Sequence, residues 1–286
     1  MSAAAEALPT RVSGRRIGFV AVAAGWIAAM LAVALLADVL RPYSITALDL
    51  HNRLAPPIGL GGTLRHTLGT DELGRDVLSR LIVSVRISLL IAFGATAIST
   101  IVGTSLGLLA AHLRGVVEQV VLMLVDAQAA MPFMILALAV LAFLGKALPL
   151  FIALMGVYGW ERHARLARGL ALAAGTQGYV AAVRQLGAGP GRIYLRHVLP
   201  NIAATLIVSA TLAFPEVILL ESGLSFLGLG VQPPMTSLGN MVGYGRGYIE
   251  RAPWILLSPS VVIVATTLAI SVLGDWLRER LDPTLG

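Results

Sequence analysis

The chain has 286 residues, of which 57% are hydrophobic and only 13% are charged, whereas a soluble domain carries about 25% charged residues. This composition excludes an ordinary soluble protein and predicts an all-α protein that crosses a membrane several times. The sequence has no cysteine, which excludes disulfides and thiolate sites, and its net charge of +6 is spread over loops rather than gathered into a face that could bind nucleic acid.

The N-terminal part predicts one retained membrane span that starts in the cytoplasm. Residues 1–14 are expected to be a disordered cytoplasmic tail, and Arg11, Arg15 and Arg16 precede the first apolar stretch. The stretch from Ile17 to Ala37 has no charge and is long enough to cross about 30 Å of hydrocarbon. A cleaved signal peptide is the competing interpretation, but its apolar core would be only about 7–15 residues long. We therefore assign residues 15–40 to a first transmembrane helix.

Five more spans follow a polar, proline-containing segment, residues 41–86, which lies outside the membrane under this topology. The transmembrane core, residues 87–277, contains them, and residues 278–286 are expected to be a cytoplasmic tail. The five spans are expected at about residues 87–111, 117–145, 148–160, 201–216 and 253–274. The fourth span of the protein, residues 148–160, is too short for a full crossing, so it needs part of the helix that follows.

The segment between the fourth and fifth spans, residues 161–200, is expected in the cytoplasm because it is rich in arginine. Its arginines are Arg162, Arg165, Arg168, Arg184, Arg192 and Arg196. The prediction is a polytopic protein of about six spans with both termini in the cytoplasm.

Residues 176–200 are the one long amphipathic stretch between two spans. Thr176 can cap a short helix. That helix would have one apolar face, made of Tyr179, Val180, Val183 and Leu186. Gly187 is expected to close it in the left-handed conformation, and Pro190 suits the first position of a second helix. The pattern predicts a helix-turn-helix.

The same stretch resembles the EAA loop of ABC-importer permeases, the cytoplasmic coupling element that docks into a groove on the ATPase subunit. This sequence departs from the pattern at three positions. Ala181 replaces the first residue, Glu; Val183 replaces the third, Ala; and His197 replaces the usual Ile. The resemblance implies that the docking residues are Ala181, Ala182, Arg184, Gly187, Ala188, Leu199 and Pro200. An ordinary amphipathic loop of another kind of carrier is the alternative.

Three acids and two arginines alternate with glycines between residues 69 and 80, where Asp71, Arg75, Asp76 and Arg80 could form a paired network. This stretch, GTDELGRDVLSR, resembles the GTDxxGRDxxSR signature of peptide and nickel ABC permeases. The resemblance implies an extracytoplasmic signature or gate at Gly69, Thr70, Asp71, Gly74, Arg75 and Asp76. A metal site or an acid/base pair among the carboxylates is the weaker alternative, because each carboxylate has an arginine close by.

Asp126 lies within the expected third span, six residues before Pro132. An acid inside a membrane is functional or is paired within the bundle. Its setting resembles the VDxxxxxP pattern of the same permeases, which implies a mainly architectural role. A role in the transport pathway is the alternative.

Near the end of the fifth span, Glu216 and Glu221 precede a glycine-rich stretch that ends in Pro233-Pro234. Irregular backbone at membrane depth is tolerated only where protein or water covers it. The stretch resembles the E-x-x-LSFLGLG-x-x-PP signature of the family. A gate or cavity wall on the outer side would include Glu221, Ser225, Phe226, Gly228 and Gly230. Close packing of glycine faces is the alternative.

Enzyme and metal motifs are missing from the sequence. It has no GxSxG, HExxH or GxxxxGK[ST] pattern, and its five histidines lack ligand spacing. No metal site and no catalytic residue are therefore expected, and any ATP and Mg²⁺ would be bound by partner subunits.

Three signatures occur in the order found in the C-type permease subunits of bacterial dipeptide, oligopeptide and nickel ABC importers, which the chain resembles. This implies the type I importer permease fold in the bacterial cytoplasmic membrane. It also implies four partners: a homologous B-type permease, two ATPase subunits and an extracytoplasmic substrate-binding protein. Peptides are the expected cargo, with nickel chelates, haem or another small solute as alternatives. An ion-coupled carrier, or an enzyme using Asp126 or Glu216 as acid/base, is the alternative from a different class.

Overall fold

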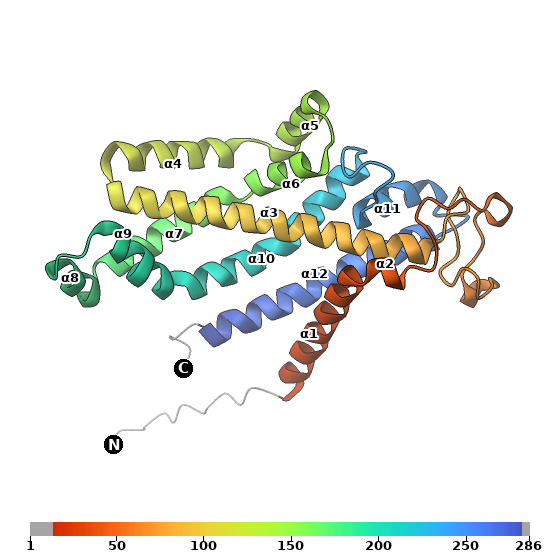
Figure 1. Cartoon of the computed structure of the whole chain (residues 1–286), viewed down its shortest axis with the longest axis horizontal. Helices are drawn as coiled ribbons and strands as arrows, with labels where there is room; N and C mark the ends of the chain where they lie inside the picture. The colour runs from red at the N-terminus through yellow and green to blue at the C-terminus, as the bar shows by residue number, and fades with distance from the viewer. Residues whose placement is uncertain (1–13, 282–286) are drawn as a thin grey trace, which may run out of the picture.

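The computed structural model describes residues 14–281, and in this range the regular structure is helical (Figure 1). The tail predicted at residues 1–14 therefore lies almost wholly outside the described residues. The helices are α1 (Gly14–Leu35), α2 (Ala37–Leu40), α3 (Val77–Leu113), α4 (Gly115–Ala130), α5 (Phe133–Leu144), α6 (Leu148–Val157), α7 (Trp160–Gly175), α8 (Gly178–Gln185), α9 (Pro190–Ile193), α10 (Leu199–Phe226), α11 (Leu238–Gly245) and α12 (Trp254–Leu281).

The long helices lie side by side, with the two predicted functional regions at opposite ends. Figure 1 shows α8 and α9 at one end of the long axis and α11 with the loops of residues 41–76 at the other. Helices α3 and α10 run between these ends, and α12 packs along α10. The first helix is held to the bundle by Trp26, whose Nε1 donates to Thr266 Oγ1 at 3.1 Å, and by Arg86, whose Nε donates to the carbonyl of Ala34 at 2.7 Å.

Four helical runs in the described part of the chain are long and apolar enough to cross a membrane: residues 18–35, α3, the run from Pro190 to Phe226, and α12. The expected third span, 117–145, is not one straight helix, because α4 and α5 meet at a bend of 89°. The bend follows from Pro132, which has no amide hydrogen to donate and forces Met131 into an extended conformation. A continuous third span was therefore a wrong prediction, and α4 with α5 form either a broken span or a re-entrant loop.

Two spans begin earlier than the sequence pattern predicts. Helix α3 starts at Val77 rather than at 87, because Asp76 caps it by accepting the amide hydrogen of Ser79 at 2.7 Å. The fifth span starts at Pro190 rather than after Pro200. Pro200 cannot donate a backbone hydrogen bond, and a π-helical turn (Tyr194–Val198) before it carries the chain from α9 into α10. At the C-terminal end, residues 278–281 belong to α12 and not to a separate tail.

The expected fourth span is divided at Gly159, which takes the left-handed conformation between α6 and α7. The second part, α7, belongs to the segment expected to be a loop, yet it packs along α3 as a helix of 16 residues. The approach is close: a Cβ at Gly103 would lie 2.3 Å from the carbonyl oxygen of Trp160, and one at Gly107 would lie 2.4 Å from that of Ala164. Glycines four residues apart let the two backbones meet.

The apolar core has two main parts. The larger joins α3, α5, α6, α10 and α12, and its most buried side chains include Ile91, Leu141, Phe151, Met155 and Ile218. The second lies where α7 leads into α8 and α9 leads into α10. It is made of Ala167, Ala171, Ala174, Val180, Ile193, Val198, Ile202 and Leu206 with Ala111 of α3. The helix-turn-helix end is therefore packed onto the bundle.

The α3–α7 contact can be tested by making the same change, Gly to Ala, separately at a glycine in the contact and at a glycine outside it. Gly107→Ala places a methyl group against the α7 backbone and should lower the free energy of unfolding by about 1–3 kcal/mol, as overpacking does. Gly169→Ala on the open face of α7 meets no atom within 4 Å, so it should leave the thermal midpoint unchanged or raise it. Equal midpoints for the two purified variants would contradict the close contact.

Candidate functional site

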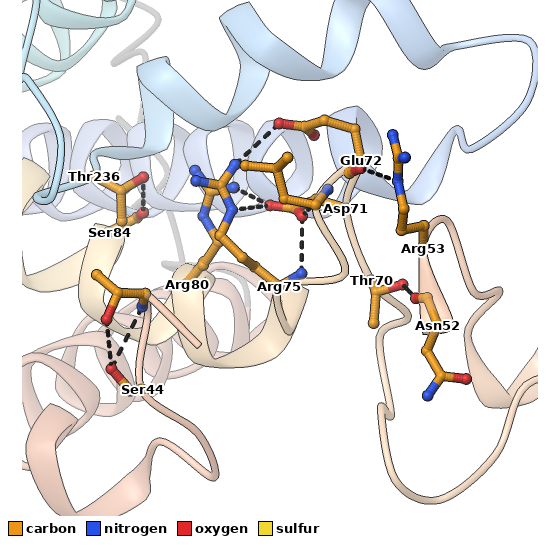
Figure 2. A network of polar contacts seen from close by, with 12 residues as sticks. Ser44, Asn52, Arg53, Thr70, Asp71, Glu72, Arg75, Arg80, Ser84 and Thr236 are labelled. Atoms are coloured by element: carbon orange, nitrogen blue, oxygen red, sulfur yellow. Dashed lines mark hydrogen bonds and ion pairs between the residues drawn. The ribbon is translucent and has the colours of Figure 1, made fainter. Parts of the chain in front are cut away.

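The end of the bundle opposite α8 and α9 (Figure 1), which the sequence predicts to be the outer end, contains a buried charge network centred on Asp71. Arg75 and Arg80 converge on its carboxylate, with Arg75 Nε at 2.6 Å, as Figure 2 shows. The backbone amides of Leu73 and Arg75 donate to its Oδ1, each at 2.9 Å. Glu72 accepts from Arg75 at 3.0 Å and supplies the second negative charge. Two acids, Asp71 and Glu72, thus balance two arginines, and both oxygens of Asp71 accept hydrogen bonds.

The other residues of the GTDELGRD stretch fold the outer segment onto itself. Gly69 and Gly74 both have positive φ, and a Cβ at Gly74 would lie 1.8 Å from the carbonyl oxygen of Asp49. The buried hydroxyl of Thr70 donates to the carbonyl of Asn52, and the carbonyl of Thr70 accepts from Trp254 of α12 at 3.1 Å. The signature is therefore explained by backbone geometry as well as by charge.

Two further polar contacts fix this segment. His66 Nδ1 lies 3.0 Å from Asp76 Oδ1, so Asp76 holds the segment at the same time as it caps α3. The side chain of Asn52 donates to Asp49 at 2.9 Å, and this hydrogen bond lowers the pKa of Asp49. The loops of residues 41–76 are thus a structured platform over the ends of α3 and α12.

The second outer signature surrounds the buried carboxylate of Glu221. Glu221 accepts from Ser225 at 2.7 Å, from Ser237 at 2.6 Å and from Ser88 of α3 at 3.4 Å. A Cβ at Gly230 would lie 1.8 Å from Ser225 Oγ, so only glycine fits there. The carboxylate consequently ties α10, α3 and the start of α11 together.

The remaining residues of this predicted gate lie at the end of α10. Gly228 has a φ of +80° just beyond the helix, and its carbonyl accepts from Lys146 at 3.1 Å. Phe226 is partly exposed and lies under the guanidinium of Arg246, 4.6 Å from its ring centre. The structure thus brings the predicted residues of the second signature together.

The two outer signatures also contact each other. Ser84 Oγ donates to Thr236 Oγ1 at 3.1 Å, and Ser88 Oγ accepts the amide hydrogen of Leu238 at 3.0 Å (Figure 2 for the first). A cavity of about 520 Å³ lies between them, lined by Arg75, Arg80, Pro233, Pro234 and Tyr244 among others. Sequence reasoning missed Ser84 and Ser88. Their signal is the four-residue spacing of two hydroxyls on an apolar helix, which places both on one face.

Charged pairs join α7 to its neighbours. Arg165 binds Asp126 of α4 at 3.0 Å, so the predicted intramembrane acid is paired, although 73% of its side chain is exposed. Arg168 binds Glu118 of α4, and Arg162 binds Glu216 of α10 at 2.6 Å. Three of the six arginines assigned to a cytoplasmic loop therefore lie on a packed helix.

At the opposite end, α8 and α9 form the expected helix-turn-helix. Gly187 has a φ of +80° after α8, and Pro190 starts α9. Thr176 does not cap α8. Gln177 takes that position, and Thr176 ends α7, where its hydroxyl donates to the carbonyl of Ala173 at 2.8 Å.

The predicted apolar face of α8 is divided between the core and the surface. Val180 is buried and Val183 half-buried, whereas 86% of Leu186 is exposed. Of the predicted docking residues, the exposed ones are Ala181, Ala182, Arg184, Gly187 and Pro200, and the half-buried ones are Ala188 and Leu199. Leu186, which the docking prediction omitted, is the most prominent apolar side chain of this end.

Comparison with known proteins identifies the family. Residues 103–286 match the sequence model of the protein family described as binding-protein-dependent transport system inner membrane component. The chain belongs to this family. Similar proteins are the di/tripeptide transport system permease protein DppC of Pseudomonas aeruginosa, 43% identical over 88% of this chain and 84% of that protein, and the glutathione transport system permease protein GsiD of Pectobacterium atrosepticum, 35% identical over 93% and 87%. The oligopeptide transport system permease protein OppC of Mycobacterium bovis is 34% identical over 85% and 83%.

Among solved structures, a chain of the MetNI methionine ABC transporter in an inward-facing conformation aligns with a TM-score of 0.58. It is 21% identical, and the match covers 72% of this chain and 97% of that chain. This likeness concerns the fold, which is the type I ABC importer permease fold expected from the sequence.

The role of Asp71 can be tested by Asp71→Asn, which keeps its shape and removes its charge. The buried Arg80 and the half-buried Arg75 then lose a counterion, and the free energy of unfolding should fall by about 3–5 kcal/mol. Asp38→Asn is the control, because the carboxylate of Asp38 binds Arg86 with 62% of its side chain exposed and should matter little. Thermal unfolding of the purified variants measures both, and an unchanged midpoint for Asp71→Asn would contradict the network.

Proposed function

We propose that this permease forms half of the pathway of a peptide importer and couples it to ATP hydrolysis by partner subunits. The observation that carries the proposal is the placement of an exposed helix-turn-helix at one end of the bundle and two interlocked polar signatures at the other (Figure 1). An importer needs both ends. The end with the polar signatures would receive solute outside the cell, and the helix-turn-helix would bind the ATPase inside and move with it.

The proposed partners are a second, homologous permease, two ATPase subunits and an extracytoplasmic binding protein. ATP and Mg²⁺ belong to the ATPase subunits, and this chain carries out no catalysis. In the bacterial cytoplasmic membrane, the α8–α9 end and both termini face the cytoplasm, and the 41–76 platform faces outward to the binding protein. The arginines Arg184, Arg192 and Arg196 near α8 and α9 favour this orientation.

Coupling follows from how the α8–α9 end is connected. Helix α7 runs into α8, and α9 continues through the π-helical turn into α10. Val180 and Ile193 of the tip are buried against Ala171 and Ala174 of α7. A displacement of the tip therefore moves α7 and α10 with it rather than bending a loose loop. An ATPase dimer that binds the tip differently in its two states would shift the pathway between inward and outward access.

Peptides are the proposed cargo because several relatives carry dipeptide, di/tripeptide or oligopeptide transport in their names. One relative is named for glutathione, itself a small peptide. Nickel chelates, haem and other small solutes are the alternatives within this family. A secondary carrier or a membrane-embedded enzyme would act without ATPase partners, so co-purification of two ATPase chains separates those classes from this one.

Leu186→Asp tests docking. Burying one leucine contributes about 1.5–3 kcal/mol, so its loss should weaken ATPase binding by about 10–100-fold. The wild-type complex, reconstituted into liposomes with its binding protein, should take up a labelled dipeptide only with ATP, and the variant should lose this uptake. Leu64→Asp in the outer segment, where 84% of the side chain is exposed, is the control and should retain ATPase binding. Equal ATPase recovery with both variants would overturn the docking role.

Orientation can be tested with single cysteines, since the chain has none of its own. Gln185→Cys lies on the exposed tip, and Thr63→Cys on the exposed outer segment. An impermeant thiol reagent should label Thr63→Cys in spheroplasts and Gln185→Cys only in inside-out vesicles. Labelling of Gln185→Cys from outside would place the tip on the wrong side for an ATPase.

A further inference from the structure

A half-exposed ion pair lies inside the membrane part of the bundle. Arg162, in the first turn of α7, contacts Glu216 of α10 with both terminal nitrogens, at 2.9 Å to Oε1 and 2.6 Å to Oε2. The side chains are 49% and 44% exposed, so the pair is not sealed within this chain. The sequence singled out Glu216, but neither the signatures nor the docking end uses it.

The depth of the pair follows from the helices. Glu216 lies ten residues before Phe226, about 15 Å from the outer end of α10 at 1.5 Å per residue. On the inner side, Arg278 in the last turns of α12 lines the same cavity as Arg162 and Glu216. The ion pair therefore lies within the hydrocarbon layer, which is about 30 Å thick, and not at its outer surface.

Charges that are half-exposed at this depth cannot face lipid, because a charge in hydrocarbon is too unfavourable. They must face water or another protein. The adjoining cavity, about 300 Å³, has the hydroxyls of Ser99, Tyr158, Thr205 and Ser209 in its wall, together with apolar residues such as Leu212 and Val217. The neighbouring residues of α10, Ile207 and Ala210, line a different and more apolar cavity. Helix α10 thus has one side with hydroxyl and charged groups and one side that is apolar.

The arginine is positioned to remain in place if its partner leaves. Arg162 Nη2 donates to the hydroxyl of Tyr158 at 3.3 Å, and its guanidinium lies 5.6 Å from the centre of the same ring. Tyr158 in turn packs against Phe133, with ring centres 4.9 Å apart. A carboxylate other than Glu216 can therefore be bound without rearranging α7.

We infer that this cavity is a cargo site on the translocation pathway, where Arg162 binds the carboxylate of a zwitterionic peptide and Glu216 binds its ammonium group. The inference rests on the proposed function. The exchange replaces the Arg162–Glu216 pair by two pairs with the ligand, while Arg162 keeps its 3.9 Å contact with Glu161, and Arg278 adds a second positive charge to the wall of the cavity. A volume of about 300 Å³ is at the small end of ligand sites and suits a short peptide. Binding that must displace an existing pair is weak, as passage requires.

Adjacent residues of α10 provide the test. In the assembled complex in nanodiscs, a water-soluble thiol reagent should modify Ser209→Cys, which faces the polar cavity, and spare Ala210→Cys, which faces the apolar one. A transported dipeptide at ten times its half-saturating concentration should slow the modification of Ser209→Cys about tenfold. Modification is read as the mass shift of this chain. Resistance of Ser209→Cys, or equal reactivity at the two positions, would overturn the aqueous cavity.

Charge recognition is tested by adding Arg162→Gln and Glu216→Gln to Ser209→Cys. The reagent should still react, but the peptide should no longer slow it, and dipeptide uptake should fall. The control is Arg168→Gln with Glu118→Gln, which removes another ion pair of α7 and should leave peptide protection unchanged. Protection that survives in the Arg162/Glu216 variant would overturn this site alone. Absence of dipeptide uptake by the unmodified complex would instead contradict the proposed function.

Discussion

The close contact between α3 and α7 determines where the charges of the bundle lie. Gly103 and Gly107 bring the two backbones together, with Ala164 and Ala167 of α7 buried between them. The arginines of α7 lie around the rest of the helix, with Arg168 beside the small-residue face, four residues after Ala164, and Arg162 and Arg165 further from it. There they meet acids from α4 and α10. The small residues thus set the contact with α3, and the ion pairs join α7 to its other neighbours.

At the outer end, two buried carboxylates hold separate segments of the chain together. Asp71 and Glu221 are both buried, yet Asp71 is surrounded by guanidinium and amide donors and Glu221 by three serine hydroxyls. A buried carboxylate whose donors come from several segments holds those segments in one arrangement, because each broken contact leaves an unsatisfied polar group. The 41–76 platform and the start of α11 are therefore fixed to α3, which makes the outer end a rigid counterpart to the α8–α9 tip.

Much of this architecture was predictable where a residue has one local role. The start of α9 at Pro190 and the left-handed Gly187 follow from backbone chemistry alone, and the three signatures led to the family. The predictions went wrong where a residue acts in two ways. Pro132 lies in an apolar stretch without lowering its hydropathy, but it also interrupts the helix there. The hydropathy pattern therefore predicted one straight span.

The arginines of α7 misled the sequence reading for a related reason. The positive-inside rule counts charges without knowing their partners, and Glu118, Asp126 and Glu216 are 50, 39 and 54 residues away from the arginines they bind. The four-residue spacing of Gly103 and Gly107 was the available signal that a helix packs there. Such spacings are too frequent in membrane helices to identify a contact by themselves, without the buried alanines of α7 on the other side.

The two sides of α10 differ in the chemistry of the residues that they carry. One side, with Ile207, Ala210 and Phe214, lines an apolar cavity of about 780 Å³ between α3 and α12, where acyl chains or an apolar protein surface can be accommodated. The other side carries Glu216 with Thr205 and Ser209. Because α10 begins at the tip that we assign to the ATPase, a movement of that tip would turn or shift the polar side of α10 relative to α7. The Arg162–Glu216 pair bridges these two helices, so the contact we assign to cargo is also one that the coupling motion would strain.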